Sequence, residues 1–174
     1  IKRLIIDQWK CFNMIKIFVT GGTFDKDYDE KNGKLYFKET HMNEILDLGR
    51  SKVDVNIETL MMLDSLDMKD SDRKLIVEKC TKSKENHIVI THGTDTMTDT
   101  ARELGLKKLN KTIVLTGAMI PYKFGTSDGL FNISSALAYV QTLTKGVYVA
   151  MNGRVFTYDK VIKNKNTGIF EEII

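Results

Sequence analysis

Short runs of apolar and β-branched residues, each followed closely by glycine, constrain the fold of this chain most strongly. Three such runs span residues 15–20, 87–91 and 112–116, and a glycine follows each run within two positions. Runs with so little alternation between apolar and polar residues are typical of parallel strands that are buried on both faces of a sheet. The chain is therefore predicted to contain a buried, mostly parallel sheet.

Segments with helical periodicity separate these runs. We predict helices over about 41–48, 70–83, 95–106 and 130–143, and further strands over 53–62, 146–151 and 154–158. Strands that alternate with helices of this length indicate βαβ units, and right-handed crossovers place helices on both faces of the sheet. The predicted fold is a three-layer α/β domain of the flavodoxin-like kind, and no element is predicted for residues 160–174.

The polar segment 25–37 interrupts this pattern after the first strand. It contains Asn32-Gly33, the strongest short signal for a β-hairpin turn, ahead of the mainly apolar stretch 34–37. We predict a hairpin that projects from the end of the first strand as a mobile flap.

Composition limits the classes of function. The 174 residues suit one domain over residues 14–174, and we expect residues 1–13 to be an extension outside that domain. The net charge of +3 is too small to indicate a nucleic-acid-binding surface, and no apolar run approaches the roughly 20 residues of a membrane span. We therefore expect a small-molecule substrate, with neither nucleic acid nor a membrane as partner.

Several motifs of cofactor and metal enzymes do not occur in the sequence. The P-loop, the dinucleotide-binding GxGxxG, the zinc-protease HExxH and the redox CxxC are missing. The three histidines, His41, His87 and His92, are scattered along the chain, so no metal site is predicted. Cys11 and Cys80 fit neither a disulfide pattern nor a metal pattern, which favours reduced thiols and a cytoplasmic location.

Two threonines follow the ends of two predicted strands. Thr23 comes directly after Gly21-Gly22, where glycine lets backbone N–H groups approach a ligand closely. Thr94-Asp95 lies at the predicted start of a helix. In open α/β sheets the carboxyl ends of the strands form the ligand-binding edge, so both threonines are candidates for one site. Taken alone, Thr94 and Asp95 are better explained as N-cap residues.

Taken together, the two threonine segments resemble the two signature segments of the bacterial-type L-asparaginase family, most closely its cytoplasmic type I enzymes. The segments are Thr20-Gly21-Gly22-Thr23 and residues 90–97. Further segments agree with the family in their order along the chain, namely 64–68, 116–121, 127–132, and 146–152 with 161–164. The resemblance runs from about Met14 to the C-terminus and implies an amidohydrolase.

The resemblance implies that the nucleophile lies on the flexible loop that leads into the flap. Thr23 matches the family's nucleophilic threonine, which needs a base or a polarising partner because a hydroxyl is a weak nucleophile. Tyr36 matches the flap tyrosine that assists it, and Tyr28 is the alternative. A simpler interpretation is that Tyr36 only packs on the hairpin.

A second triad is implied by Thr94, Asp95 and Lys163. In this assignment Lys163 keeps Asp95 ionised and favours deprotonation of Thr94 or of a bound water. The resemblance leaves open whether Thr23 forms an acyl-enzyme or whether water attacks directly with Thr94 as the key group. The alternative for Lys163 is a solvent-exposed surface lysine beside Lys160 and Lys165.

The resemblance also implies the groups that bind the substrate. Asp95 would take the α-ammonium group, Ser65 with nearby N–H groups would take the α-carboxylate, and the Ala118 carbonyl would orient the amide. Ser65 could instead be only a turn residue. The full set of implied substrate-binding residues is Asp64, Ser65, Gly93, Thr94, Asp95 and Ala118.

The function implied is the conversion of L-asparagine and water into L-aspartate and ammonia, with L-glutamine as a second candidate substrate and no cofactor or metal. Family members usually carry a second domain that helps form the dimer and contributes to the neighbour's site, and we expect it to begin where this chain ends. A homo-oligomer is expected. The alternatives are a non-catalytic module that binds Asn or Asp, and an amidase subunit that needs a partner chain.

Overall fold

The computed structural model describes residues 14–173, so the predicted extension of residues 1–13 lies outside the described residues, as does Cys11. The main sheet has six strands in the order β4-β1-β5-β6-β7-β8. Their bounds are β1 Ile15–Gly21, β4 Val55–Leu63, β5 His87–Thr91, β6 Thr112–Thr116, β7 Gly146–Met151 and β8 Arg154–Thr157.

The strand order confirms the predicted α/β fold. The strands β4, β1, β5, β6 and β7 pair in parallel, and only β8 runs antiparallel, beside β7. Counted along the chain, the five parallel strands lie in the order 2-1-3-4-5, which is the flavodoxin-like order. The ligand-binding edge of such a sheet lies at the carboxyl ends of its strands.

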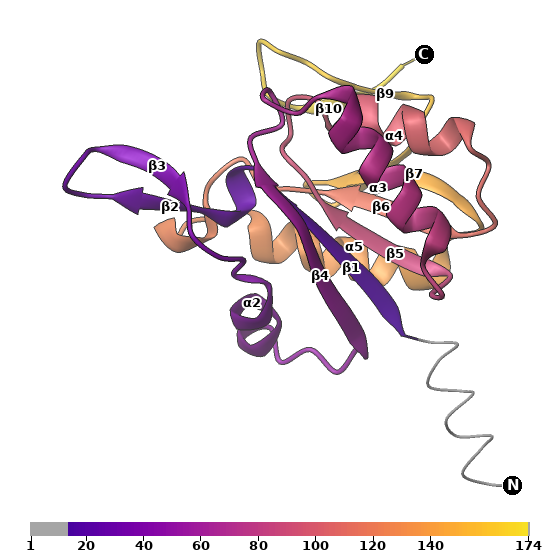
Figure 1. Cartoon of the computed structure of the whole chain (residues 1–174), viewed down its shortest axis with the longest axis horizontal. Helices are drawn as coiled ribbons and strands as arrows, with labels where there is room; N and C mark the ends of the chain where they lie inside the picture. Colours follow the sequence, from indigo (N-terminus) through magenta and orange to yellow (C-terminus); the bar gives the residue numbers. More distant parts are fainter. Residues whose placement is uncertain (1–13, 174) are drawn as a thin grey trace, which may run out of the picture.

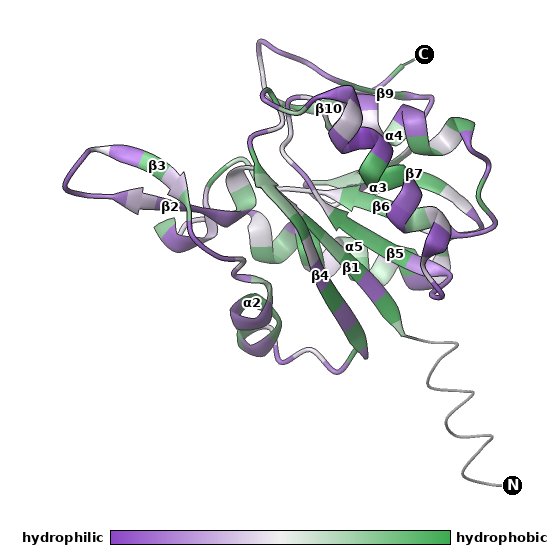
Figure 2. Cartoon of the chain, in the orientation of Figure 1, coloured by the Kyte–Doolittle hydropathy of each residue, from purple (hydrophilic) through white to green (hydrophobic). Residues whose placement is uncertain are grey.

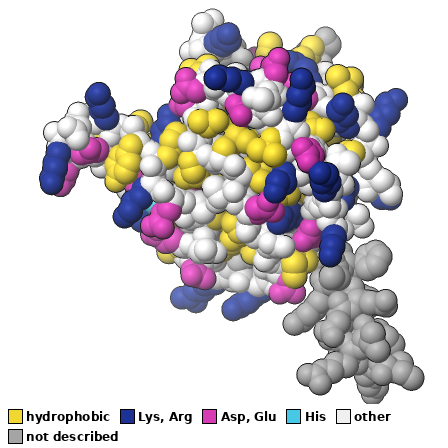
Figure 3. Space-filling view, viewed as in Figure 1, with side chains coloured by type: hydrophobic (Ala, Val, Ile, Leu, Met, Phe, Trp, Pro, Cys, Tyr) yellow, Lys and Arg dark blue, Asp and Glu magenta, His cyan; other side chains and the backbone are white. Residues whose placement is uncertain are grey.

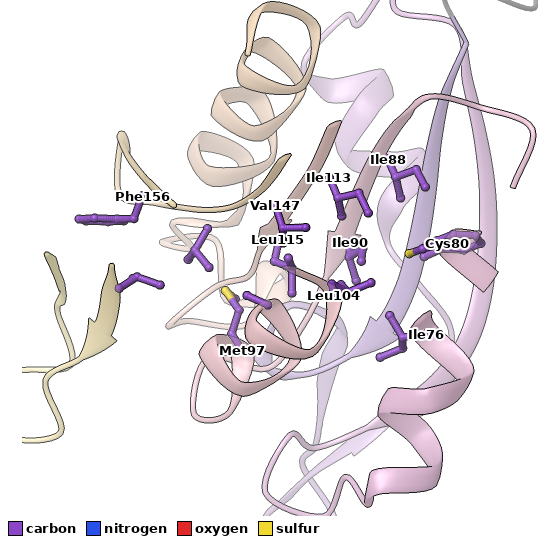
Figure 4. Close-up of a cluster of buried hydrophobic side chains, with 14 of the residues drawn as sticks. Ile76, Cys80, Ile88, Ile90, Met97, Leu104, Ile113, Leu115, Val147 and Phe156 are labelled. Carbon is purple, nitrogen blue, oxygen red and sulfur yellow. The ribbon is translucent and has the colours of Figure 1, made fainter. Parts of the chain in front are cut away.

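Helices cover both faces of the sheet (Figure 1). The helices α3 (Asp70–Lys82) and α4 (Met97–Leu106) pack on one face, and α2 (Met42–Leu48) and α5 (Gly129–Thr142) pack on the other. Successive residues of a strand point to opposite faces, and both faces are apolar here, as in β5, where Ile88 and Ile90 enter one core and Val89 the other. Figure 4 shows the first of these cores, and Figure 2 shows that apolar residues concentrate in the central strands.

The predicted hairpin is present after the first strand. Strands β2 (Lys26–Asp29) and β3 (Lys34–Phe37) pair in antiparallel register, and Gly33 adopts φ 66° in the turn. The Asp29 carboxylate accepts hydrogen bonds from the backbone N–H groups of Lys31 and Asn32 at 3.0 and 3.2 Å, which closes the turn locally. The hairpin extends away from the sheet in Figure 1, and its movement as a flap stays a prediction.

The structure corrects the prediction for the last fifteen residues, for which no element was expected. Strands β9 (Val161–Lys163) and β10 (Phe170–Glu172) form a second antiparallel hairpin, with Val161 and Phe170 buried in the core under α4. Strands of three residues are too short to show a periodic pattern, so burial against the rest of the protein is what defines them.

Charged side chains are mixed on the surface. The face in Figure 3 shows cationic and anionic groups interspersed rather than one extended basic patch. Among residues 14–173, no helix is long and apolar enough to span a membrane.

Candidate active site

The carboxyl ends of β1 and β5 lie side by side, and close backbone contact joins the loops that follow them. The Thr20 hydroxyl donates to the Thr91 carbonyl at 2.8 Å. Gly22 has φ 75°, and a Cβ at this position would collide with the backbone of Gly93. Only glycine allows these loops to approach so closely, and the contact brings the Thr23 loop beside the segment that carries Thr94.

Lys163 links Thr94 and Asp95. Its ammonium group donates to Thr94 Oγ1 at 2.8 Å and to Asp95 Oδ1 at 2.7 Å. The Lys163 side chain is 12% exposed and that of Asp95 is 48% exposed. Lys163 is therefore not a freely solvated surface residue. An ammonium group can only donate, so Thr94 Oγ1 accepts this bond, and the adjacent cation favours the deprotonated form of the hydroxyl.

The structure rules out the N-cap interpretation of Thr94 and Asp95. Helix α4 begins at Met97, two residues later than predicted, and its N-cap residue is Thr96. The predicted helix start at Asp95 was wrong because Thr96 keeps a non-helical backbone while its hydroxyl donates to the Ser65 carbonyl at 2.8 Å. Thr94 and Asp95 therefore lie in the loop ahead of the helix, where Lys163 binds both.

Asp64 and Ser65 follow the end of β4, on the other side of β1. The Ser65 hydroxyl is buried and has no hydrogen-bond partner in the described part of the chain. It packs closely on Gly93, because a Cβ added at position 93 would lie only 2.5 Å from Ser65 Oγ. Burial acts to raise the pKa of Asp64, but its ion pair with Lys26 and the hydrogen bond from Leu66 N–H outweigh this and hold the pKa below its usual value.

The loop after β6 packs on the same segment. A Cβ at Gly117 would collide with the His92 carbonyl and lie 3.3 Å from Thr94 Cγ2. The side chain of Asn132 donates to the Gly117 carbonyl at 2.9 Å, which holds the loop in place. Ala118 lies in this loop but is fully buried, and its contact with a substrate stays a prediction.

Neither candidate tyrosine makes a hydrogen bond with Thr23 in the described part of the chain. Tyr36 is 43% exposed and stands opposite Asp27, whereas Tyr28 stands opposite Leu35 and packs edge-on against Phe124 with 6.3 Å between ring centroids. Residues directly opposite each other share a face, so the two tyrosines lie on opposite faces of the hairpin. Neither hydroxyl makes a hydrogen bond with any described residue, and the choice between them stays a prediction.

Asp25 ties together the two ends of the hairpin. Its Oδ1 accepts hydrogen bonds from Thr40 Oγ1 at 2.9 Å and from His41 N–H at 3.1 Å. Burial raises the pKa of Asp25 above its usual value, although these hydrogen bonds oppose the shift. Nothing in the residue pattern singled out this carboxylate, because its partners lie fifteen and sixteen residues away across the hairpin.

His92 was also missed as a structural part of the site. Its ring is fully buried, Nδ1 lies 2.8 Å from the Gly93 carbonyl, and Nε2 lies 2.8 Å from Thr100 Oγ1. The carbonyl can only accept, so Nδ1 carries the proton and Nε2 accepts from Thr100. Burial lowers the pKa of His92 from 6.5 to about 4, so the ring is neutral near pH 7.

A cavity of about 910 Å³ opens beside Asp95 and Lys163. Apolar walls come from Leu66, Met119 and Ile162, none of which was singled out in the sequence. Among residues 14–173, no group of three or more His, Cys, Asp and Glu side chains comes together as a metal site.

One further motif was missed in the sequence and proves to be structural. Residues 125–129 have the GxSxG spacing of hydrolase nucleophiles, but Ser127 Oγ donates to the Ile120 carbonyl at 2.6 Å and accepts from Gly129 N–H. The segment connects the short 3-10 helix η2 (Tyr122–Phe124) to the first residue of α5, Gly129, rather than following the end of a strand. Its serine serves to shape that connection.

Comparison with known proteins identifies the family of this chain. The family model described as "Asparaginase, N-terminal" matches residues 14–170. The chain is 32% identical over 166 residues to L-asparaginase 2 of Escherichia coli, covering 89% of this chain and 47% of that protein. It is 33% identical over 177 residues to a glutamyl-tRNA(Gln) amidotransferase subunit of Methanococcus vannielii, covering 97% of this chain and 40% of that protein.

A solved structure of a probable cytoplasmic L-asparaginase from Campylobacter jejuni is similar with a TM-score of 0.79 and 31% identity. The match covers 92% of this chain and 53% of that chain. This chain thus spans about half the length of the relatives that it matches. Because the family model extends over nearly all of the described residues, the protein belongs to the asparaginase family.

Proposed function

We propose that this protein is an amidohydrolase that converts L-asparagine and water into L-aspartate and ammonia. The observation that carries the proposal is the Lys163 ammonium group bound to both Thr94 and Asp95, beside the loop that carries Thr23. A hydroxyl and a carboxylate held by one cation, next to a second, free hydroxyl, suit the hydrolysis of an amide whose substrate bears its own charges.

Asp95 would bind the α-ammonium group of the substrate. Lys163 engages only Oδ1, and Oδ2 has no hydrogen-bond partner among the described residues, so one carboxylate oxygen is available on a side chain that is half exposed. Ser65 would bind the α-carboxylate, because its buried hydroxyl has no hydrogen-bond partner among residues 14–173. Asp95 and Ser65 would thus bind the two charged groups that distinguish an amino acid from a simple amide.

Thr23 would supply the nucleophile. Thr23 is a partly exposed residue at the start of the short 3-10 helix η1 (Thr23–Asp25), and its hydroxyl makes no hydrogen bond with another described residue. The oxygen would attack the carboxamide carbon, and N–H groups of the glycine loop would hold the oxyanion. The amide nitrogen would take a proton and leave as ammonia, and water would then cleave the Thr23 ester to release aspartate. Tyr36 would assist after the hairpin moves inward.

A second candidate function is an amidase subunit that acts with a partner chain on a larger substrate. The match to the amidotransferase subunit of Methanococcus vannielii, over 97% of this chain, favours it as the runner-up. We also propose that the protein forms a homo-oligomer and that it is cytoplasmic. L-Glutamine stays the second candidate substrate beside L-asparagine.

Ammonia release from L-Asn, L-Gln and D-Asn tests the proposal, with Thr23→Ala and Thr94→Val beside the parent. We expect both variants to lose at least about 100-fold in kcat, and Thr126→Ala, on an exposed loop outside the site, to match the parent. Full activity in both site variants would show that the site assignment is wrong. Calorimetry with L-aspartate tests the alternative of a non-catalytic module. Binding of aspartate without ammonia release would show that the protein binds the amino acid but does not hydrolyse the amide.

A further inference from the structure

Arg73 is a buried cation that the proposed mechanism does not use. It lies in the first turns of α3 and is only 8% exposed. Its guanidinium donates to the Met68 carbonyl at 3.2 Å and to Thr96 Oγ1 at 3.1 Å. The carboxylate of Asp70 lies 3.9 Å away and is largely in solvent. Burying a cation without a close, buried carboxylate is costly, which makes Arg73 a candidate for a functional role.

The donor and acceptor of each hydrogen bond around Arg73 can be assigned. A guanidinium can only donate, so Thr96 Oγ1 accepts from Arg73, and its single proton is free for the Ser65 carbonyl at 2.8 Å. The same peptide unit is held from its other side, because Leu66 N–H donates to Asp64 Oδ1 at 3.1 Å. The carbonyl and N–H of one planar peptide are thus both fixed.

These bonds join two segments that are far apart in sequence. Arg73 holds the segment 64–68 through the Met68 carbonyl, and it holds the turn 94–96 through the Thr96 hydroxyl. The first segment carries Ser65 and the second carries Asp95. Their relative position therefore depends on a side chain that contributes two donors in a fixed geometry, which lysine cannot supply.

We propose that Arg73 is a positioning residue for the proposed hydrolysis: through Thr96 it sets the distance between the group that binds the substrate's α-carboxylate and the group that binds its α-ammonium. The inference rests on the proposed function for its effect on substrate. The hydrogen bonds from Arg73 to Met68 and Thr96 and from Thr96 to Ser65, called the brace below, concern the protein alone. Arg73 contacts neither Thr23 nor Lys163 by any hydrogen bond in the described chain, so its loss acts on substrate binding rather than on the bond-breaking step.

Arg73→Met and Thr96→Val each remove the brace from one end. A hydrogen bond that involves a charged group corresponds to about a 10- to 100-fold change in a binding constant. We expect both variants to raise KM for L-asparagine and Kd for L-aspartate by about that factor, while kcat changes by less than about threefold. The double variant should be no worse than Thr96→Val alone, because that substitution already removes both hydrogen bonds of the Thr96 hydroxyl, to Arg73 and to the Ser65 carbonyl.

Conservative variants separate positioning from charge and from general stability. Thr96→Ser keeps the hydroxyl and should recover most of the affinity, whereas Arg73→Lys keeps the charge but not the fork and should recover only part of it. Arg50→Met, at an exposed position, serves as the control for removal of a surface cation. Full recovery in Arg73→Lys, additive losses in the double variant, or a fall in kcat at constant KM would overturn the proposal.

Hydrogen exchange of the full chain tests the brace independently of activity. The amides of Leu66 and Asp67 are held within the segment 64–68, Leu66 by the Asp64 carboxylate and Asp67 by the Asp64 carbonyl at 3.0 Å. We expect both amides to exchange faster in Arg73→Met and in Thr96→Val. If the parent neither binds aspartate nor releases ammonia, the proposed function fails, and unchanged exchange in both variants would separately refute the brace.

Discussion

His92 makes the stability of this protein depend on pH in a way that can be calculated. The ring is fully buried between β5 and α4, and its pKa falls from an ordinary 6.5 to about 4 because burial disfavours the charged form. The unfolded chain takes up a proton as the pH drops below about 6.5, whereas the folded protein does so only near pH 4. Acid therefore favours the unfolded state across this window.

The size of the effect follows from the gap between the two pKa values. At about 1.4 kcal/mol for each tenfold change in proton affinity, the gap between 6.5 and about 4 amounts to about 3 kcal/mol. The contribution of His92 is complete above about pH 7, has fallen by about 2 kcal/mol at pH 5, and levels off below pH 4. For a domain with a total stability of about 5–15 kcal/mol, this is a large share.

Urea unfolding at half-unit steps between pH 4 and pH 7.5 measures this dependence. Other groups titrate in the same range, so the informative quantity is the difference between the parent and His92→Gln, whose side chain is neutral at every pH. We expect the variant to be less stable at pH 7, where His92 packs well, and to lose about 3 kcal/mol less than the parent on acidification.

A matched control separates titration from destabilisation. Ile113→Val, in the buried strand β6, should lower the free energy of unfolding by about 1 kcal/mol at every pH and leave the slope unchanged. Parallel curves for the parent and His92→Gln would refute the reasoning, because they would show that the histidine takes up its proton equally in both states.

Three further substitutions test other parts of the structure. Gly22→Ala and Gly125→Ala both place a side chain at φ 75°, but only the new methyl group at position 22 would collide with backbone atoms. Gly125→Ala should lower the free energy of unfolding by about 1 kcal/mol through backbone strain, and Gly22→Ala should lower it by more. Equal melting temperatures of the two variants would contradict the close approach of the loops. Asn132→Ala should lower the free energy of unfolding by about 2–4 kcal/mol, because a fully buried amide loses three hydrogen bonds; a urea midpoint within error of the parent would count against this. Lys163→Met should reduce kcat for ammonia release by at least about 100-fold while the exposed Lys160→Met does not, and equal rates would remove Lys163 from the proposed mechanism.

The sequence alone determined the layered fold because its signals are local and repeated. Runs such as 87–91 and 112–116 are apolar or β-branched at nearly every position, and only a strand with both faces covered buries such a run completely. The existence of the hairpin was equally predictable from the Asn32-Gly33 signal, although its strands are joined by four residues, 30–33, rather than by a two-residue turn. The resemblance to a known family then identified residues along the chain whose partners no local pattern could supply.

Only the tertiary structure decided which of these residues meet. Lys163 is 68 positions from Asp95, and its two hydrogen bonds exist because β9 packs beside α4, although a three-residue strand leaves no periodic signal. The same holds for Arg73, whose partner Thr96 is 23 positions away on another element. Local patterns fix strands and turns because their energies are local, whereas a site assembled from loop ends depends on how separate elements pack, and that is set by the whole core at once.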